Sequence, residues 1–275
     1  GDVYKRQLYG PTYYTLKVKM CGISKVETIP AVVEAKPDYM GLVFAPSKRQ
    51  VTVDQAKTLV EELHKQYGNR YSREEVQCSN DVVQDGAVIG AVQEGTATGD
   101  AHEGTLTSTE NASPTLIHQE AIKTVGVFVN ETLENLVTIA TEVNLDVVQL
   151  HGDEDEAFIQ SLKERTNVEI WKAVQIRSAA DAEAWIDSSA DMLLFDAYHK
   201  DERGGTGEVF DWSCLDEFER PFMLAGGIDS TNVARAIRTV RSYGIDISSG
   251  IETDGVKDNE KITAFTKLVR TIAMP

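Results

Sequence analysis

The sequence lacks a long apolar segment and has only three cysteines in 275 residues. No run approaches the roughly 20 apolar residues that a membrane-spanning helix needs, so we expect no membrane partner. Cys21, Cys78 and Cys214 lie far apart, without the paired spacing of a disulfide framework or a zinc site. We therefore expect a protein of a reducing compartment, without a bound metal.

Basic side chains are also scarce, with 27 Lys and Arg against 44 Asp and Glu and a net charge of −17. A general nucleic-acid binder needs a basic surface, so we expect no nucleic-acid partner. A small anionic ligand is still compatible with this charge, because a local site can be positive on an acidic protein.

The first 14 residues, GDVYKRQLYGPTYY, have no clear periodicity, and DVYKRQ resembles translated adapter sequence. They contain no basic segment followed by an apolar core and a cleavage site, so we expect no secretory signal and a cytoplasmic location. We interpret residues 1–14 as a non-native extension and residues 15–275 as the folded domain.

From Leu16 onward, short apolar segments alternate with segments of helical periodicity. The predicted strands cover residues 16–21, 39–44, 122–129, 146–150, 168–174, 191–196, 221–226 and 244–250. Capping boxes at Ser24 with Glu27 and at Thr52 with Gln55 predict the first two helix starts. Further helices are predicted near 154–165, over 178–187 and, as a short one, from about Asp211. Eight strand–helix units predict an α/β fold, a (β/α)8 TIM barrel, with an open doubly wound sheet as the alternative.

A long low-complexity insertion, residues 68–120, separates the second predicted helix from the third strand. It holds nine acidic and two basic residues, many Gly, Ser and Thr, and almost no aromatic residue. Such a composition buries too little apolar surface to offset the entropy of ordering, so we predict mostly disorder. Its apolar patch, residues 82–93, predicts a local hairpin. A tolerated surface loop and a partner-binding segment are both open.

The active site of a parallel barrel lies at the carboxyl ends of its strands, and the first predicted strand ends in Lys19-Met20-Cys21. Lys19 and Cys21 share a face, and a nearby ammonium lowers the pKa of a thiol. A thiolate at this position can act as a general base, and a buried structural cysteine is the alternative. Since the eighth strand neighbours the first in a closed barrel, Asp246 could pair with Lys19. That pairing would orient the lysine and weaken its effect on Cys21.

The sixth strand ends in Asp196, either a helix cap or a site residue, and the loops after strands 6, 7 and 8 are rich in glycine. Glycine-rich loops expose backbone N–H groups, which bind phosphate at this end of many barrels. Ordinary turns are the alternative. The candidate phosphate-binding residues are Gly204, Gly205, Gly227, Ser249 and Gly250.

Two further strand ends carry polar groups. Gln149 and His151 lie on one face at the end of the fourth strand, as substrate-binding residues or as satisfied structural ones. Lys48 and Arg49 follow the second strand, where Arg49 could bind a substrate carboxylate through a bidentate fork. A solvated surface pair is the alternative there.

These strand ends together resemble the phosphoribosylanthranilate isomerase family. The matching runs are KMCGIS (19–24), GLVFAPSKRQV (41–51), VGVFVNE (125–131), VVQLHGDE (147–154), LLFDAYHKDERGGTGEVFDW (193–212), LAGGIDSTNVARAI (224–237) and DISSGIETDGVKD (246–258). They occur in the family's order and cover nearly all of residues 16–273 outside the insertion. LLFDA with GGTG and KMCGI is a combination that related phosphate-binding barrels lack.

The resemblance implies an isomerase of tryptophan biosynthesis that rearranges N-(5-phosphoribosyl)anthranilate, with Cys21 as general base and Asp196 as general acid. It places the substrate carboxylate on Arg49 and the phosphate on the glycine-rich loops, and implies no metal or organic cofactor. The remaining predicted substrate-binding residues are Gln149, His151 and Asp246, with Lys19 supporting Cys21. We expect a phosphorylated small molecule as partner and a monomer or homodimer.

Two other functions are open from the sequence. Another phosphosugar barrel, such as a histidine-pathway isomerase or indole-glycerol-phosphate synthase, usually has a carboxylate or lysine where this chain has Cys21. A non-catalytic phosphate-binding barrel needs neither Cys21 nor Asp196, so the presence of both argues against it.

Overall fold

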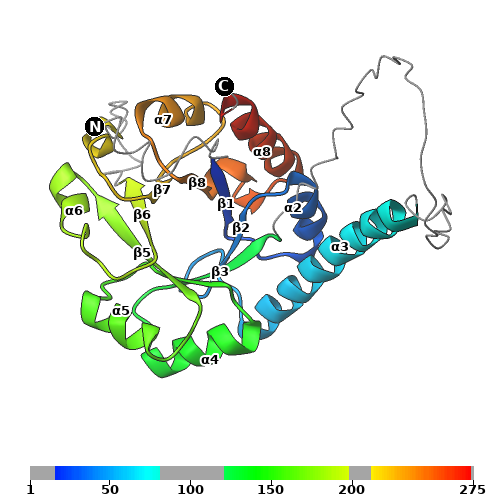
Figure 1. Cartoon of the computed structure of the whole chain (residues 1–275), viewed down its shortest axis with the longest axis horizontal. Helices are drawn as coiled ribbons and strands as arrows, with labels where there is room; N and C mark the ends of the chain where they lie inside the picture. Colours follow the sequence, from blue (N-terminus) through cyan, green and yellow to red (C-terminus); the bar gives the residue numbers. More distant parts are fainter. Residues whose placement is uncertain (1–15, 81–120, 198–211, 274–275) are drawn as a thin grey trace, which may run out of the picture. The chain divides into compact units, whose positions relative to one another are not determined.

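In the computed structural model, residues 16–80, 121–197 and 212–273 are described, residues 68–80 by their backbone alone. Eight parallel strands close into a barrel in chain order, and the first strand pairs with the last, so the predicted closed barrel is confirmed over an open sheet. Figure 1 shows helices around this sheet. The strands are β1 (Lys17–Cys21), β2 (Tyr39–Val43), β3 (Lys123–Phe128), β4 (Val147–Leu150), β5 (Glu169–Ile176), β6 (Met192–Ala197), β7 (Phe222–Ala225) and β8 (Gly244–Ile247).

Helices connect the strands. In the described residues the α-helices are α2 (Ile29–Ala35), α3 (Val53–Asn80), α4 (Leu133–Val143), α5 (Glu156–Lys163), α6 (Ala179–Glu183), α7 (Val233–Thr239) and α8 (Asn259–Ala273). Three short 3-10 helices are η1 (Val26–Thr28), η2 (Trp212–Leu215) and η3 (Ser249–Ile251). The short helix predicted from about Asp211 is therefore the 3-10 helix η2.

One of the two predicted capping boxes forms. The backbone N–H of Gln55 donates to Thr52 Oγ1 at 3.2 Å, and that of Thr52 donates to Gln55 Oε1 at 2.9 Å. The prediction of a capping box at Ser24 and Glu27 is wrong, because a 3-10 helix begins at Val26 without a side-chain cap. The α-helix starts only at Ile29, where Pro30 occupies the first turn and needs no N–H partner.

Apolar side chains are buried on both faces of the sheet. Val18 and Met20 of β1 pack outward, in the cluster between the sheet and the helices. Tyr39 of β2 and Trp171 of β5 belong to the smaller inner cluster, and their rings meet edge to face at 4.8 Å. Since β2 and β5 are not neighbours, this contact crosses the barrel interior. The strand residues that point inward, as these two do, fill the interior of the barrel.

The chain divides into two units, residues 1–67 with 121–275, and residues 68–120, which are the bounds of the predicted insertion. The first 13 residues of that insertion are helical, because α3 continues to Asn80. The predicted disorder of 81–120, the hairpin at 82–93 and the N-terminal extension 1–14 lie outside the described residues. None of the helices in the described part of the chain is both long and apolar enough to cross a membrane.

Candidate active site

The two proposed catalytic residues lie at the same end of the barrel. Cys21 is the last residue of β1, and Asp196 is the last but one of β6. All eight strands are parallel, so their carboxyl ends surround one mouth, where β7 and β8 separate β6 from β1. Both residues also point into the barrel. Asp196 lies on the same face of β6 as Leu194 of the inner cluster, and Cys21 lies on the same face of β1 as the buried Lys19. The fold thus joins a thiol and a carboxyl group 175 positions apart in the sequence at one opening.

A buried ion pair supports the end of β1. Lys19 is fully buried, and its Nζ donates to both carboxylate oxygens of Asp246 at 3.0 Å. Burial alone would lower the pKa of Lys19, but the charges of Asp246 and Cys21 outweigh it and raise the pKa. The pairing predicted between Lys19 and Asp246 is confirmed.

The environment of the Cys21 thiol differs from the prediction. Burial raises the pKa of this thiol, Lys19 lowers it, and the nearby Asp246 carboxylate raises it again. Lys19 thus lowers the thiol pKa and Asp246 weakens that effect, both as expected, but burial makes the net direction upward. The physical reason is that Cys21 is only 9% exposed and shares its lysine with a carboxylate.

Gly41 of β2 makes room for this pair. It lies opposite Cys21 in the strand register, and a Cβ at this position would come within 3.0 Å of Cys21 Sγ and 3.3 Å of Lys19 Nζ. The absence of a side chain at Gly41 therefore leaves space for the thiol and the ammonium. Sequence reasoning did not single this glycine out, because its value depends on the neighbouring strand.

On the other side of the mouth, a chain of contacts runs from β4 to β6. Gln149 is buried, and its Nε2 lies 3.0 Å from His151 Nδ1. His151 Nε2 lies 3.3 Å from Asp196 Oδ2. The side chains of His151 and Asp196 are 27% and 32% exposed, so both are open to a ligand. The structure thus brings together three predicted residues from two strand ends, those of β4 and β6.

Arg49 meets an acidic partner that the sequence reasoning missed. Its Nε and Nη2 donate to the two carboxylate oxygens of Glu252 at 2.6 and 3.0 Å. Lys257 Nζ binds the same carboxylate at 2.9 Å and the backbone oxygen of Ser248 at 2.7 Å. Ser248 Oγ donates in turn to the backbone oxygen of Cys21 at 3.2 Å. One polar network therefore connects Arg49 with the end of β1.

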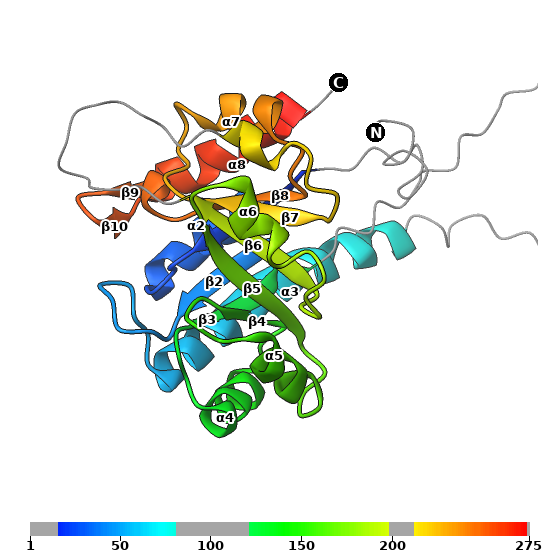
Figure 2. The same cartoon turned by 90° about the vertical axis from the view of Figure 1, so that its left-hand side faces the viewer.

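Glu252 and Lys257 lie in a hairpin of β9 (Glu252–Thr253) and β10 (Val256–Lys257). Asp254 and Gly255 form its turn with positive φ angles of 51° and 77°. An Asp-Gly pair is a strong hairpin signal, and it was present in the sequence. The predicted eighth strand, 244–250, ends instead at Ile247. The hairpin and the loop after β2 lie at the same end of the barrel (Figure 2).

The glycine-rich loops after β7 and β8 pack together. Gly226 and Gly227 have φ angles of 92° and 62°, which favour glycine. A Cβ on Gly250 would clash with the backbone at Ile228 and Asp229, so this close approach also requires glycine. Within the described part of the chain, the backbone N–H groups of Gly227, Ser249 and Gly250 have no hydrogen-bond partner. Gly204 and Gly205 lie outside the described residues.

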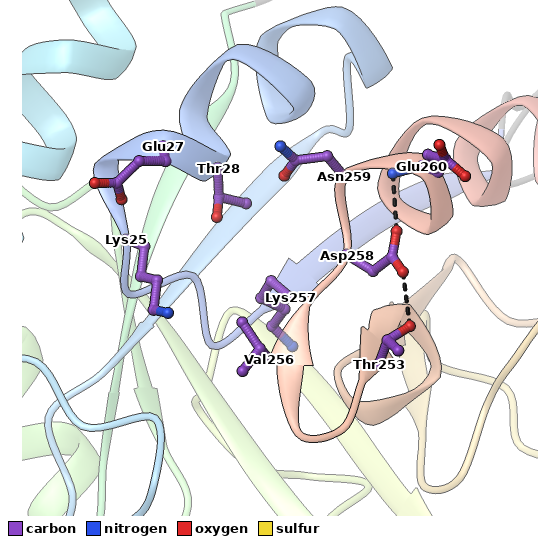
Figure 3. A pocket seen from close by; sticks show the side chains of 9 residues that line it. All are labelled: Lys25, Glu27, Thr28, Thr253, Val256, Lys257, Asp258, Asn259 and Glu260. Atoms are coloured by element: carbon purple, nitrogen blue, oxygen red, sulfur yellow. Dashed lines mark hydrogen bonds between the residues drawn. The ribbon is translucent and has the colours of Figure 1, made fainter.

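A cavity of about 580 Å³ opens between the segment of Lys25 and η1 on one side and the hairpin with the start of α8 on the other (Figure 3). Lys257 lines it, but none of the predicted site residues does. Asp258 in its wall is satisfied by Thr253 Oγ1 at 2.6 Å and by the backbone N–H of Glu260 at 3.0 Å. Its lining has mixed charge, with Glu27, Asp258 and Glu260 beside Lys25 and Lys257. The described residues also contain no group of three or more His, Cys, Asp or Glu side chains that could hold a metal.

Comparisons with known proteins agree with this geometry. The family model for N-(5'phosphoribosyl)anthranilate (PRA) isomerase matches residues 76–268. The N-(5'-phosphoribosyl)anthranilate isomerase of Thermoanaerobacter sp. (strain X514) is 38% identical over 259 residues, which cover 94% of this chain and 99% of the relative.

Solved structures give the same result. Phosphoribosyl anthranilate isomerase from Thermotoga maritima matches with a TM-score of 0.66 and 28% identity, over 93% of this chain and 99% of that one. Another phosphoribosyl anthranilate isomerase, in complex with reduced 1-(o-carboxyphenylamino)-1-deoxyribulose 5-phosphate, matches with a TM-score of 0.63 and 26% identity, over the same shares. The chain belongs to the N-(5'-phosphoribosyl)anthranilate isomerase family.

Proposed function

We propose that this chain converts N-(5-phosphoribosyl)anthranilate to 1-(2-carboxyphenylamino)-1-deoxyribulose 5-phosphate, with Cys21 as general base and Asp196 as general acid. Its family consists of isomerases of tryptophan biosynthesis that interconvert an aldose and a ketose. The ligand named for one solved relative is the reduced form of the proposed product. The catalytic assignment is supported mainly by the position of Cys21 and Asp196, which lie at the same end of the barrel.

The proposed chemistry needs an acid and a base at one sugar. Asp196 protonates the ring oxygen of the furanose, the ring opens, and a Schiff base forms between C1 and the aryl amine. The Cys21 thiolate then removes the proton from C2, which gives an enolamine that tautomerises to the ketone. The amine already joined to the sugar accepts the electrons, so no further electron sink is needed.

The remaining residues bind and orient. We propose that the backbone donors of Gly227, Ser249 and Gly250 bind the substrate phosphate, together with Gly204 and Gly205. We assign the substrate carboxylate to Arg49. Gln149 and His151 keep their predicted substrate contacts, supported by their position beside Asp196.

Asp246 was predicted to contact substrate. Both of its oxygens bind Lys19, so we assign it to orienting that lysine beside Cys21. The predicted partner is a phosphorylated small molecule. A monomer or a homodimer remains the prediction for the assembly, and a dimeric enzyme is named for one Thermotoga maritima relative.

The test is an assay of anthranilate fluorescence on wild type, Cys21→Ser and Asp196→Asn. General acid–base groups contribute about 10²- to 10⁴-fold each, so kcat should fall by orders of magnitude in both variants. Binding of the reduced product should stay close to wild type, because the phosphate loops are untouched. Wild-type turnover in both variants would rule out the acid–base assignment.

A further inference from the structure

Glu252 stands at the centre of the positive charge in the mouth. Its carboxylate is only 5% exposed and binds Arg49 and Lys257, with Lys48 at 3.5 Å. Three cations around one anion leave a net charge of +2 in a protein of −17. This net positive charge can attract an anionic ligand, although Glu252 already neutralises one of the three cations.

The way in which Glu252 binds Arg49 leaves one edge of the guanidinium open. An arginine has five N–H donors in a planar fork. Glu252 takes the edge formed by Nε and Nη2, and no described residue accepts a hydrogen bond from Nη1. The second edge, formed by Nη1 and the other hydrogen of Nη2, matches the two oxygens of a carboxylate.

The position of the Arg49 stem relates this open edge to the reacting centre. A Cβ on Gly22 would lie 2.5 Å from Arg49 Cδ, so the stem crosses the residue that directly follows Cys21. Gly22 has a φ angle of 79°, which makes glycine the favoured residue there. The guanidinium is therefore anchored beside the end of β1.

We propose that Glu252 is a positioning residue that determines specificity for carboxylated substrates, by fixing the plane of Arg49 so that its open edge binds the carboxylate on the aryl ring. The proposal rests on the proposed function and deepens it. Glu252 itself does not touch the substrate, but acts through Arg49.

The charge state of Glu252 supports this role. Burial alone would raise the pKa of Glu252, but hydrogen bonds from Arg49 and Lys257 outweigh it and lower the pKa to about 2. The carboxylate is therefore charged at any pH near neutrality, and Arg49 is held before a ligand arrives. Fixing a flexible side chain in advance reduces the ordering entropy that binding would otherwise cost.

Two ligands measure the effect: the reduced product, and the same molecule without its ring carboxylate. Wild type should bind the carboxylated ligand more tightly. Glu252→Gln removes the charge, and Glu252→Asp keeps it on a side chain too short for the fork. The preference is the ratio of the two dissociation constants. In both variants it should fall about tenfold or more, the size expected for a lost charge-assisted pair. Lys48→Met is the control for charge: it removes one positive charge from the cluster without touching the fork, so the preference should fall less than in the Glu252 variants.

A second readout does not depend on the ligand. The Nε–H of Arg49 should exchange slowly with solvent in ligand-free wild type and faster in both Glu252 variants, as measured by nitrogen-15 NMR. If Glu252→Gln does not fold, Glu252→Asp still tests the fork with the charge retained.

The two proposals fail in different ways. Wild type that neither isomerises the substrate nor prefers the carboxylated ligand overturns the proposed function and the role of Glu252 with it. Active wild type whose preference survives in Glu252→Gln and Glu252→Asp overturns only the role of Glu252. A stronger preference for the carboxylated ligand in Glu252→Gln than in wild type would also overturn it, because the added net positive charge would then matter more than the orientation of Arg49.

Discussion

Lys19 and Asp246 close the barrel with a buried ion pair. Lys19 lies on β1 and Asp246 opposite it on β8, 227 positions later, with both oxygens of the carboxylate 3.0 Å from the ammonium. The first and last strands of the fold are therefore joined by charge as well as by backbone hydrogen bonds. The same pair faces the Cys21 thiol, so it affects both stability and the chemistry of the site.

Breaking this pair should be costly. Lys19→Met or Asp246→Asn should each lower the free energy of unfolding by about 3–5 kcal/mol, because one buried group then loses its charged partner. The double variant Lys19→Met with Asp246→Asn should lose less free energy of unfolding than the sum of the two single losses, because no buried charge then lacks a partner. Urea denaturation of all four proteins measures this. Additive losses would contradict the pairing.

The two members of the pair should move the thiol pKa in opposite directions. In a Cys78→Ser and Cys214→Ala background, the rate of Cys21 alkylation by iodoacetamide should rise with pH, with a midpoint above that of an ordinary thiol. Lys19→Met should move the midpoint up, because the thiolate loses its cation. Asp246→Asn should move it down, because a repelling carboxylate is gone. Shifts of the same sign in both variants would argue against this account.

Adding a methyl group at Gly41 fills space beside Cys21, whereas adding one at Gly126 fills space in the hydrophobic core, so the two substitutions can be compared. Gly41→Ala places a Cβ 3.0 Å from Cys21 Sγ, so kcat should fall sharply with a modest change in stability. Gly126→Ala places a Cβ 2.8 Å from Phe128 Cε2, and overpacking should cost about 1–3 kcal/mol while Cys21 alkylation stays normal. Kinetics together with urea midpoints separate the two effects. A normal kcat in folded Gly41→Ala would show that this space is dispensable.

Deletion of residues 70–118 should leave turnover nearly intact. Among the α3 side chains that the structure describes, residues 53–67, the buried ones are Ala56, Leu59, Val60 and Leu63, before the cut. β3 begins at Lys123, shortly after the insertion, and the start of a strand lies at the opposite end of the barrel from the carboxyl ends. The kcat and KM of the deleted protein give the comparison, and circular dichroism confirms that the barrel is folded. A folded but inactive product would show that the insertion takes part in the reaction.

The sequence by itself determined the barrel and the strand ends that carry Cys21 and Asp196. These features are local: strands and helices have their own periodicities, and parallel strands place their last residues together. The Thr52–Gln55 cap is also a short-range pattern. The Asp254-Gly255 turn was equally readable, although it was not used.

Only the tertiary structure decided the partners and the charge states. Arg49 and Glu252 are 203 positions apart, and no periodicity relates them. The upward direction of the Cys21 pKa depends on how burial, Lys19 and Asp246 balance in three dimensions. A sequence names the charged groups, but their effect on one another follows from distance and from the loss of water, which exist only once the barrel has closed.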